Sequence, residues 1–307
     1  MQGKATYYVI AVLIVCAWAL IVLRVNAFFD ADNTYAVQYV SVAPPNFDSP
    51  LHTVPPIGNI EDSKLLWLVN CENPLPYSFV PNNLVTHQGI RLHPLAYAAY
   101  SEMLAAMKAD GIIGLRLASA YRPYEHQSYL FNGKVDAFIA LGHSKEDAVE
   151  LASAVLQRPG ASEHQTGLAL DVTLDGYLEQ DFANTRAGQW IAANSHRFGF
   201  IIRYTQAKTD VTQIIYEPWH LRYVGTPHAL IMKENNLALE EYAQFIADSG
   251  IYIVWSEPTE SRIFYMVIHT YAWPEPPPQG LVGLSSDRPG GGVGYFLTIR
   301  RIYPALM

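Results

Sequence analysis

Hydrophobic and polar positions repeat with different periods along the chain, and these periods predict its elements. Apolar residues recur at helical spacing over residues 93–109, 125–141, 144–156, 185–198, 227–236 and 239–249. Short apolar runs bounded by Gly, Pro or polar residues predict strands at residues 65–70, 115–119, 168–173, 200–203, 213–216 and 221–224. This succession predicts an α+β domain over residues 65–249, with a central antiparallel sheet flanked by helices.

The chain begins with a run that is apolar on all faces. Residues 7–23 lie between Lys4 and Arg24 and are long enough for a transmembrane helix of about 20 residues. The small residues at 25–27 also resemble a cleavage site, so residues 1–27 are either an uncleaved anchor, which the length of the run favours, or a signal peptide. Lys4 predicts a cytoplasmic N-terminus and an extracytoplasmic remainder.

Two further regions flank the predicted domain. Residues 28–64 are rich in proline and have no sustained period, which predicts a semi-extended stalk with one short strand within residues 35–42. After Gly250, strand-like runs at residues 251–255, 263–269 and 294–302 are separated by Pro-rich and Gly-rich sequence. Residues 250–307 are therefore predicted to form a β-rich C-terminal extension, to which the pattern assigns no role.

Composition narrows the classes of partner and of metal site. Half of the 307 residues are hydrophobic, which is enough for a sizeable core. The net charge of -8 and the absence of a long basic run argue against nucleic acid as a partner. The two cysteines, Cys16 and Cys71, cannot form a cysteine cluster for structural zinc. A metal site would have to use other side chains.

Two short stretches offer such side chains. His164 and Asp171 are separated by a segment that contains Gly167, where the chain can bend and return as a strand. Glu217 and His220 lie three residues apart around a proline that excludes a helix interior, so we expect them in a turn that presents both side chains to one side. Two imidazoles and a carboxylate, with another carboxylate nearby, are typical of a catalytic zinc site that keeps one position open for water. The competing interpretation is a pair of His–carboxylate hydrogen bonds in a polar cleft.

The arrangement of these residues resembles a known family. Ser162-x-His164-x-x-Gly167-x-Ala169-x-Asp171, followed by Glu217-x-Trp219-His220-x-Arg222-Tyr223-Val224-Gly225, is similar to the signature of the VanY-type D-alanyl-D-alanine carboxypeptidases. These zinc peptidases are related to lysostaphin-like endopeptidases and to the hedgehog signalling domain. Residues 119–123 with Gln127 resemble a third family motif, in which Gly usually stands in place of Ala120. The resemblance covers residues 65–249.

The resemblance implies a role for each of these residues. His164, Asp171 and His220 would bind one Zn²⁺ per chain, and Glu217 would act as the general base that assists attack by zinc-bound water. Arg122 would stabilise either the developing oxyanion or the terminal carboxylate of the substrate. Substrate contacts are expected from Ser162 and Gln127, with Trp219 and Tyr223 shaping the pocket floor and Arg222 in a structural role.

The expected function is that of a membrane-anchored bacterial zinc D,D-carboxypeptidase. It would act outside the cell and trim the terminal D-Ala from peptidoglycan stem peptides. A peptidoglycan endopeptidase of the same zinc group is the nearest alternative, because it would differ only in having an open groove. A wall-binding or sensory module without catalysis is the alternative from another class.

Overall fold

The computed structural model describes residues 35–40, 63–249, 251–256, 261–271, 281–289 and 294–304. The predicted membrane span at residues 7–23 and most of the predicted stalk lie outside these ranges. Within them, no helix combines the length and apolar character that crossing a bilayer requires.

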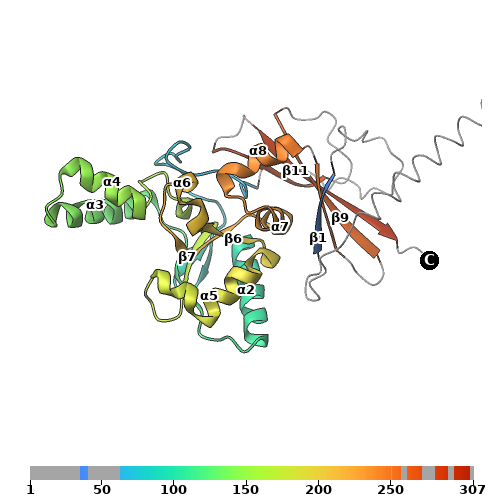
Figure 1. The fold of residues 1–307 in the computed structure, drawn as a ribbon, viewed down its shortest axis with the longest axis horizontal. Coiled ribbons are helices and arrows are strands. Elements are labelled where there is room, and N and C mark those ends of the chain that lie inside the picture. Colours follow the sequence, from blue (N-terminus) through green and yellow to red (C-terminus); the bar gives the residue numbers. More distant parts are fainter. Residues whose placement is uncertain are drawn as a thin grey trace, which may run out of the picture.

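A four-stranded antiparallel sheet forms the centre of the domain (Figure 1). Its strands are β4 (Arg116–Ser119), β5 (Ala169–Thr173), β6 (Phe200–Tyr204) and β7 (Glu217–Tyr223), in the spatial order β4-β5-β7-β6. All its pairings are antiparallel, as the sequence predicts for this sheet. The two central strands, β5 and β7, hold five of the predicted site residues, which are Asp171, Glu217, Trp219, His220 and Tyr223.

Side chains along these central strands point alternately to the two faces of the sheet, so the core lies on one face and the site on the other. Leu170 and Leu221 point into a core formed with the helices α2 (Pro94–Ala109) and α5 (Arg186–Asn194). Since neighbouring side chains on a strand point to opposite faces, Asp171 points to the other face of the sheet. The sheet thus has one apolar face that packs against helices and one face that is free to carry polar chemistry.

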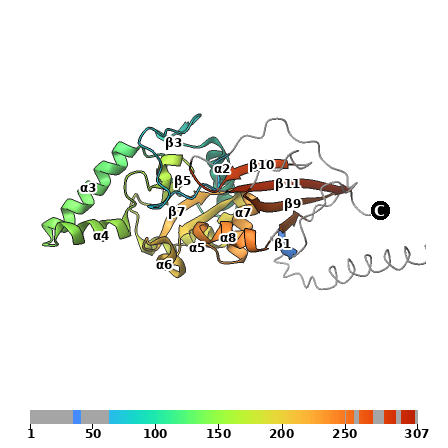
Figure 2. The ribbon, with the colours of Figure 1, turned by 90° about the horizontal axis from the view of Figure 1, so that it is seen from above.

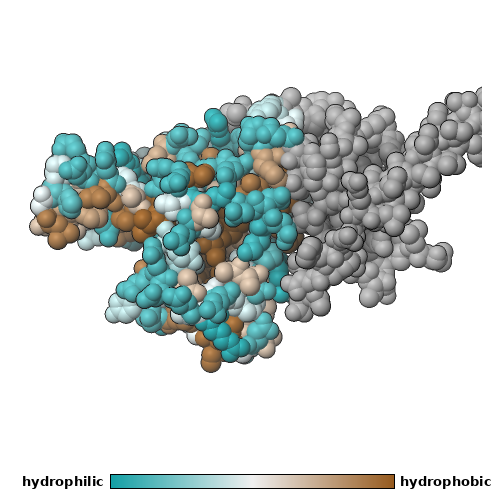
Figure 3. Space-filling model, in the orientation of Figure 1, coloured by the Kyte–Doolittle hydropathy of each residue, from teal (hydrophilic) through white to brown (hydrophobic). Residues whose placement is uncertain are grey.

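Two helices extend from the body of the domain as a hairpin. They are α3 (Tyr124–Ala140) and α4 (Lys145–Val155), and both views place them at one end of the molecule (Figures 1 and 2). They pack through a small cluster that includes Phe131 and Ala148. Brown, apolar side chains are visible along this hairpin in Figure 3. Its exposed large side chains include Tyr129 and Leu141. The Ser144 side chain accepts a hydrogen bond from the Asp147 amide and caps α4.

Short elements complete the domain. They are β2 (Val85–His87), β3 (Ile90–Leu92), η1 (Glu163–Thr166), η2 (Gln180–Asn184), η3 (Ser195–Phe198), η4 (Gln206–Lys208) and α6 (Thr209–Thr212). The hairpin of β2 and β3 was not predicted from the sequence.

A second antiparallel sheet follows the domain. Its strands are β1 (Tyr35–Val40), β8 (Ile251–Ser256), β9 (Ser261–Thr270), β11 (Tyr295–Pro304) and β10 (Leu281–Ser286), in that spatial order. The strands predicted near 251–255, 263–269 and 294–302 are confirmed, and β10 was missed. The short strand expected within residues 35–42 is β1, which pairs with β8.

Helices α7 (Thr226–Glu234) and α8 (Leu239–Ser249) join the two sheets. Their buried side chains share one cluster with Ile201 of the first sheet and with Val267 and Phe296 of the second. His228 on α7 adds polar contacts, because its ring nitrogens lie 2.9 Å from the Tyr242 hydroxyl and 3.2 Å from Thr298 Oγ1. Burial lowers the pKa of His228 to about 3, so this ring is neutral.

Two predicted strands are absent. Residues 65–70 form a turn and irregular chain, in which the Leu68 amide donates to the Asp287 carbonyl oxygen at 2.9 Å and several other backbone groups bond to side chains. Arg222 Nη2 donates to the carbonyl oxygens of Leu65 and Trp67, each at 3.0 Å, and Ser285 Oγ accepts from the Leu66 amide. These contacts agree with the structural role predicted for Arg222. Residues 213–216 are also not a strand, since Gln213 ends α6 with a φ of 59°.

Candidate metal centre

The first two candidate ligands lie on either side of a tight bend. His164 lies on η1, and Asp171 lies on β5. Between them Gly167 has a φ of 72°, and a Cβ atom there would lie 2.7 Å from the Leu84 side chain. Only glycine fits this conformation and this space. The chain therefore bends at Gly167 and returns as a strand, as predicted.

The third candidate ligand reaches the same place through the register of the sheet. Asp171 on β5 is paired with His220 on β7, and with Ser119 on β4 on its other side. Paired residues of adjacent strands present their side chains to the same face, so Asp171 and His220 meet. The prediction of a turn at residues 217–220 is wrong, because these residues begin β7. Pro218 is accepted there because the pairing of β7 with β6 is irregular at this point.

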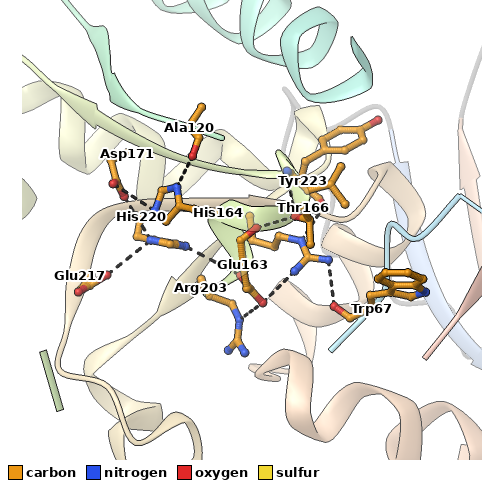
Figure 4. Close-up of polar contacts among 12 residues, drawn as sticks. Trp67, Ala120, Glu163, His164, Thr166, Asp171, Arg203, Glu217, His220 and Tyr223 are labelled. Carbon is orange, nitrogen blue, oxygen red and sulfur yellow. Dashed lines mark hydrogen bonds and ion pairs between the residues drawn. The ribbon is translucent and has the colours of Figure 1, made fainter. Parts of the chain in front are cut away.

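The three side chains enclose a site of the size of a single ion. Their facing atoms lie within 4.8 Å of one another, and all three residues are buried. Asp171 Oδ2 is 3.2 Å from Nε2 of His164, and Asp171 Oδ1 is 3.2 Å from Nδ1 of His220. Figure 4 shows the two rings on the same side of Asp171. The sequence prediction that these residues come together is therefore confirmed in space.

The protonation of His164 and Asp171 fits a bound cation. Burial lowers the pKa of His164, so its ring is neutral at pH 7. Its Nδ1 lies 2.6 Å from the Ala120 carbonyl oxygen and must donate the ring's one proton there. The lone pair on Nε2 is left facing Asp171, whose Oδ1 has no hydrogen-bond partner among the described residues. A nitrogen and a carboxylate oxygen with free lone pairs are zinc ligands.

His220 is the more basic of the two rings. Burial alone would lower its pKa, but the neighbouring carboxylates of Asp171, Glu163 and Glu217 raise the pKa to about 9. A place that attracts a proton so strongly also attracts a metal ion, which displaces the proton as it binds. The donor set of His164, Asp171 and His220 therefore fits a mononuclear zinc site with an open fourth position.

Glu217 lies beside this group at the start of β7. Its Oε2 is 3.6 Å from Nδ1 of His220. Burial raises the pKa of Glu217 to about 7, although His220 opposes this shift. A carboxyl group with this pKa can both accept and return a proton near neutral pH.

Arg122 brings a positive charge to the same place from the end of β4. Its Nη2 lies 3.5 Å from Asp171 Oδ2 and donates to Ser119 Oγ at 3.0 Å. Its Nη1 donates to Gln127 Oε1 at 2.7 Å, while Gln127 Nε2 donates to the Gln157 carbonyl oxygen. Both ends of the Gln127 amide are thus occupied within the protein. The structure places Gln127 behind Arg122 as a support, and not at the surface where a substrate contact was predicted.

A cavity of about 210 Å³ opens onto the candidate ligands. Arg122, Ser162, Glu217 and Trp219 line it, as expected of residues that meet a substrate. The remaining lining residues are Val155, Leu156, Gln157, Leu178, Tyr204 and Ile214. No motif marks them, because they come from four separate segments that only the fold brings together.

Tyr223 is not among the residues that line this cavity. It lies three positions after His220 on β7, so it points to the opposite face, where its ring packs against Phe200. It borders a different cavity, together with Gly225 and Thr298. The position of Tyr223 therefore does not fit the predicted contact with a substrate at the metal site.

A buried cluster of four charges lies below the ligands, and sequence reasoning missed it. Glu163 Oε1 lies 2.8 Å from Arg203 Nε and 2.8 Å from Arg222 Nη1. The guanidinium of Arg203 also binds both carboxylate oxygens of Glu240 on α8, at 2.5 and 2.8 Å. A glutamate next to His164 in the motif was the available signal, but nothing in the sequence shows that it is buried.

Two imidazoles and a carboxylate around one point, with a second carboxylate and an arginine beside them, define a single-metal hydrolase. The comparisons agree with this class. Residues 89–226 match the family described as VanY, D-alanyl-D-alanine carboxypeptidase. A D-alanyl-D-alanine carboxypeptidase of Enterococcus faecalis is 33% identical over 226 residues, which are 73% of this chain and 82% of that protein. The chain belongs to the VanY family of D-alanyl-D-alanine carboxypeptidases.

Solved structures show the same fold. A variant of the vancomycin resistance D,D-pentapeptidase VanY in complex with Zn(II) is 37% identical, with a TM-score of 0.52 over 58% of this chain and 98% of that one. The LD-carboxypeptidase LdcB is 35% identical, with a TM-score of 0.51 over 58% of this chain and 84% of that one. Among four curated relatives, the matched part covers between 48% and 96% of their own length.

Proposed function

We propose that the chain is a zinc-dependent D,D-carboxypeptidase that removes the terminal D-Ala from peptidoglycan stem peptides. The observation that carries this proposal is the convergence of His164, Asp171, His220, Glu217 and Arg122 around one cavity. Membership of the VanY family supports the substrate class, and the zinc-bound relative supports the metal.

The chain's own side chains would hold one Zn²⁺ through Nε2 of His164, the carboxylate of Asp171 and Nδ1 of His220. When bound, zinc supplies a Lewis acid that lowers the pKa of water and polarises a carbonyl group. The polar group behind His164 fixes the direction of its ring, since the Ala120 carbonyl oxygen accepts a hydrogen bond from Nδ1–H.

Glu217 is the proposed proton carrier. It takes the proton from the attacking water and later returns it to the amine of the departing D-Ala. Its position beside His220 puts it within reach of a water in the cavity, and a pKa raised by burial to about 7 suits both directions of transfer.

Arg122 is the proposed partner for negative oxygen atoms of the substrate. Gln127 and Ser119 hold its guanidinium, so it is oriented before a substrate arrives. A fixed guanidinium stabilises either the oxyanion that develops on the scissile carbonyl or the terminal carboxylate of the peptide. Ser162, which lines the same cavity, is proposed to donate a hydrogen bond to the peptide's C-terminal end, and Trp219 to shape the floor beneath it.

One comparison favours a second candidate within the same chemistry. LdcB is named an LD-carboxypeptidase, and it is about as similar to this chain as VanY is. The same metal-binding and proton-transferring residues would serve a D,D-carboxypeptidase and an L,D-carboxypeptidase, so they do not tell the two activities apart. The alternative is therefore removal of D-Ala from an L-residue instead of from another D-Ala.

Peptides with different C-termini test this proposal. We expect D-Ala release from a stem peptide that ends in D-Ala-D-Ala with a free carboxylate, and much slower release from its amidated form, because a carboxypeptidase uses that carboxylate for binding. Release is followed by mass spectrometry. Equal cleavage of both forms would indicate an endopeptidase, and preference for a peptide that ends in an L-residue followed by D-Ala would indicate the L,D activity.

The proposed setting is the outer face of the cell membrane, with a single span at residues 7–23. The apolar run supports an anchor, and the substrate class lies outside the cytoplasm. Recovery of the intact chain in the membrane fraction, with the catalytic domain open to added protease, is the expected result. A protease-protected domain would exclude this setting.

A further inference from the structure

The ring of His220 faces carboxylates on both sides. Its Nδ1 faces Asp171 and Glu217 at the metal centre, and its Nε2 faces Oε2 of Glu163 at 3.9 Å. Neither Nε2 nor Oε2 has a hydrogen-bond partner within the described part of the chain, and both atoms are buried. Nε2 of His220 can donate a hydrogen bond, and Oε2 of Glu163 can accept one.

Glu163 is held so that only one of its oxygens is available. Its Oε1 is shared by Arg203 and Arg222, both at 2.8 Å, and the side chains of all three residues are fully buried. The Oε2 atom is left pointing toward His220, as Figure 4 shows. A small closing movement of the His220 ring would bring the two atoms into hydrogen-bond distance.

We propose that Glu163 is a positioning residue for the metal centre. It accepts a hydrogen bond from Nε2–H of His220, which fixes the tautomer that has its lone pair on Nδ1 and fixes the direction of the ring. Ala120 performs the same task for His164 through its carbonyl oxygen. Partners of this kind behind a metal ligand typically change metal affinity by about 10- to 100-fold. The inference rests on the proposed function, because a free Nδ1 matters only if a metal binds there.

A purely structural role for Glu163 is the competing explanation. Glu163 and Glu240 together balance the charges of Arg203 and Arg222, so losing either carboxylate leaves a buried positive charge without its partner. Glu240 contacts Arg203 but has no ion pair with His220. Glu240→Gln is therefore a matched control, which disturbs the cluster without removing the acceptor for His220.

The test measures the Kd for Zn²⁺ alone by competition with a chromophoric chelator, on the full chain and its variants. We expect Glu163→Gln to weaken zinc binding by about 10- to 100-fold, and Glu240→Gln to bind zinc like the wild-type protein. Thermal unfolding of the zinc-free proteins should show both variants destabilised, because both disturb the same cluster.

Equal zinc affinity of Glu163→Gln and the wild-type protein, or equal weakening in both variants, would overturn the inference. If Glu163→Gln does not fold, Glu163→Asp replaces it, because it keeps the charge between the arginines but withdraws the carboxylate from His220. Weaker zinc binding in that variant supports the proposal, and unchanged binding overturns it. A wild-type protein that takes up no zinc would overturn the proposed function as well, so the two failures are distinguishable.

Discussion

A Glu217→Ala variant is expected to lose about 10²- to 10⁴-fold in kcat/KM while it keeps its zinc. The carboxylate lies 3.6 Å from Nδ1 of His220, close enough to serve a water in the cavity. It is not one of the three side chains whose atoms converge on the ion site. Removing it should therefore remove the proton carrier and leave the donor set intact.

Zinc content by elemental analysis and D-Ala release by mass spectrometry check this result together. Glu234→Ala is the control, because Glu234 is an exposed carboxylate on α7 and should behave like the wild-type protein. Wild-type rates of D-Ala release from Glu217→Ala would refute the assignment of Glu217 as the base.

Removal of the metal is expected to have the largest effect. Asp171 supplies an oxygen to each of the two histidines, so Asp171→Ala disrupts the donor set at its centre. We expect this variant to bind no zinc and to release D-Ala only at the background rate, a loss greater than the roughly 10⁴-fold limit for a general base. A chelator should produce the same loss in the wild-type protein, and added zinc should reverse it. An Asp171→Ala variant that retains zinc would contradict the donor set.

The ligands could be predicted because local sequence determines their meeting. Gly167 allows the bend that returns Asp171 toward His164, and both the spacing and the small residue are visible in the sequence. Whether His220 reaches the same site depends on the pairing of β5 with β7, which is a long-range property. The resemblance to the family signature predicted His220 as the third ligand, which the local sequence alone could not do.

The errors at the site have a common physical origin, which is the direction of a side chain. Tyr223 was expected at the substrate pocket, but on a strand it points to the face opposite His220. Strand alternation alone would not have excluded it, because Glu217 and Trp219 have the same parity and still line the cavity, where the pairing of β7 with β6 is irregular. Gln127 was expected to contact substrate, but its amide is used to hold Arg122.

The buried charge cluster shows what hydropathy patterns cannot reveal. Glu163 and Arg203 look like ordinary surface residues in the sequence, yet both side chains are fully buried because each satisfies the other. The apolar residues at 65–70 were predicted to form a strand, but they do not. The Arg222 side chain donates hydrogen bonds to two of their backbone carbonyl groups. In both cases the deciding partner is distant in sequence.

The most direct test of the account combines metal analysis with mass spectrometry of a muropeptide digest, made with and without a chelator. We expect one zinc per chain, loss of one terminal alanine from pentapeptide stems, no such loss after chelation, and recovery when zinc is restored. Release of D-Ala at an unchanged rate from protein shown to be free of metal would contradict it.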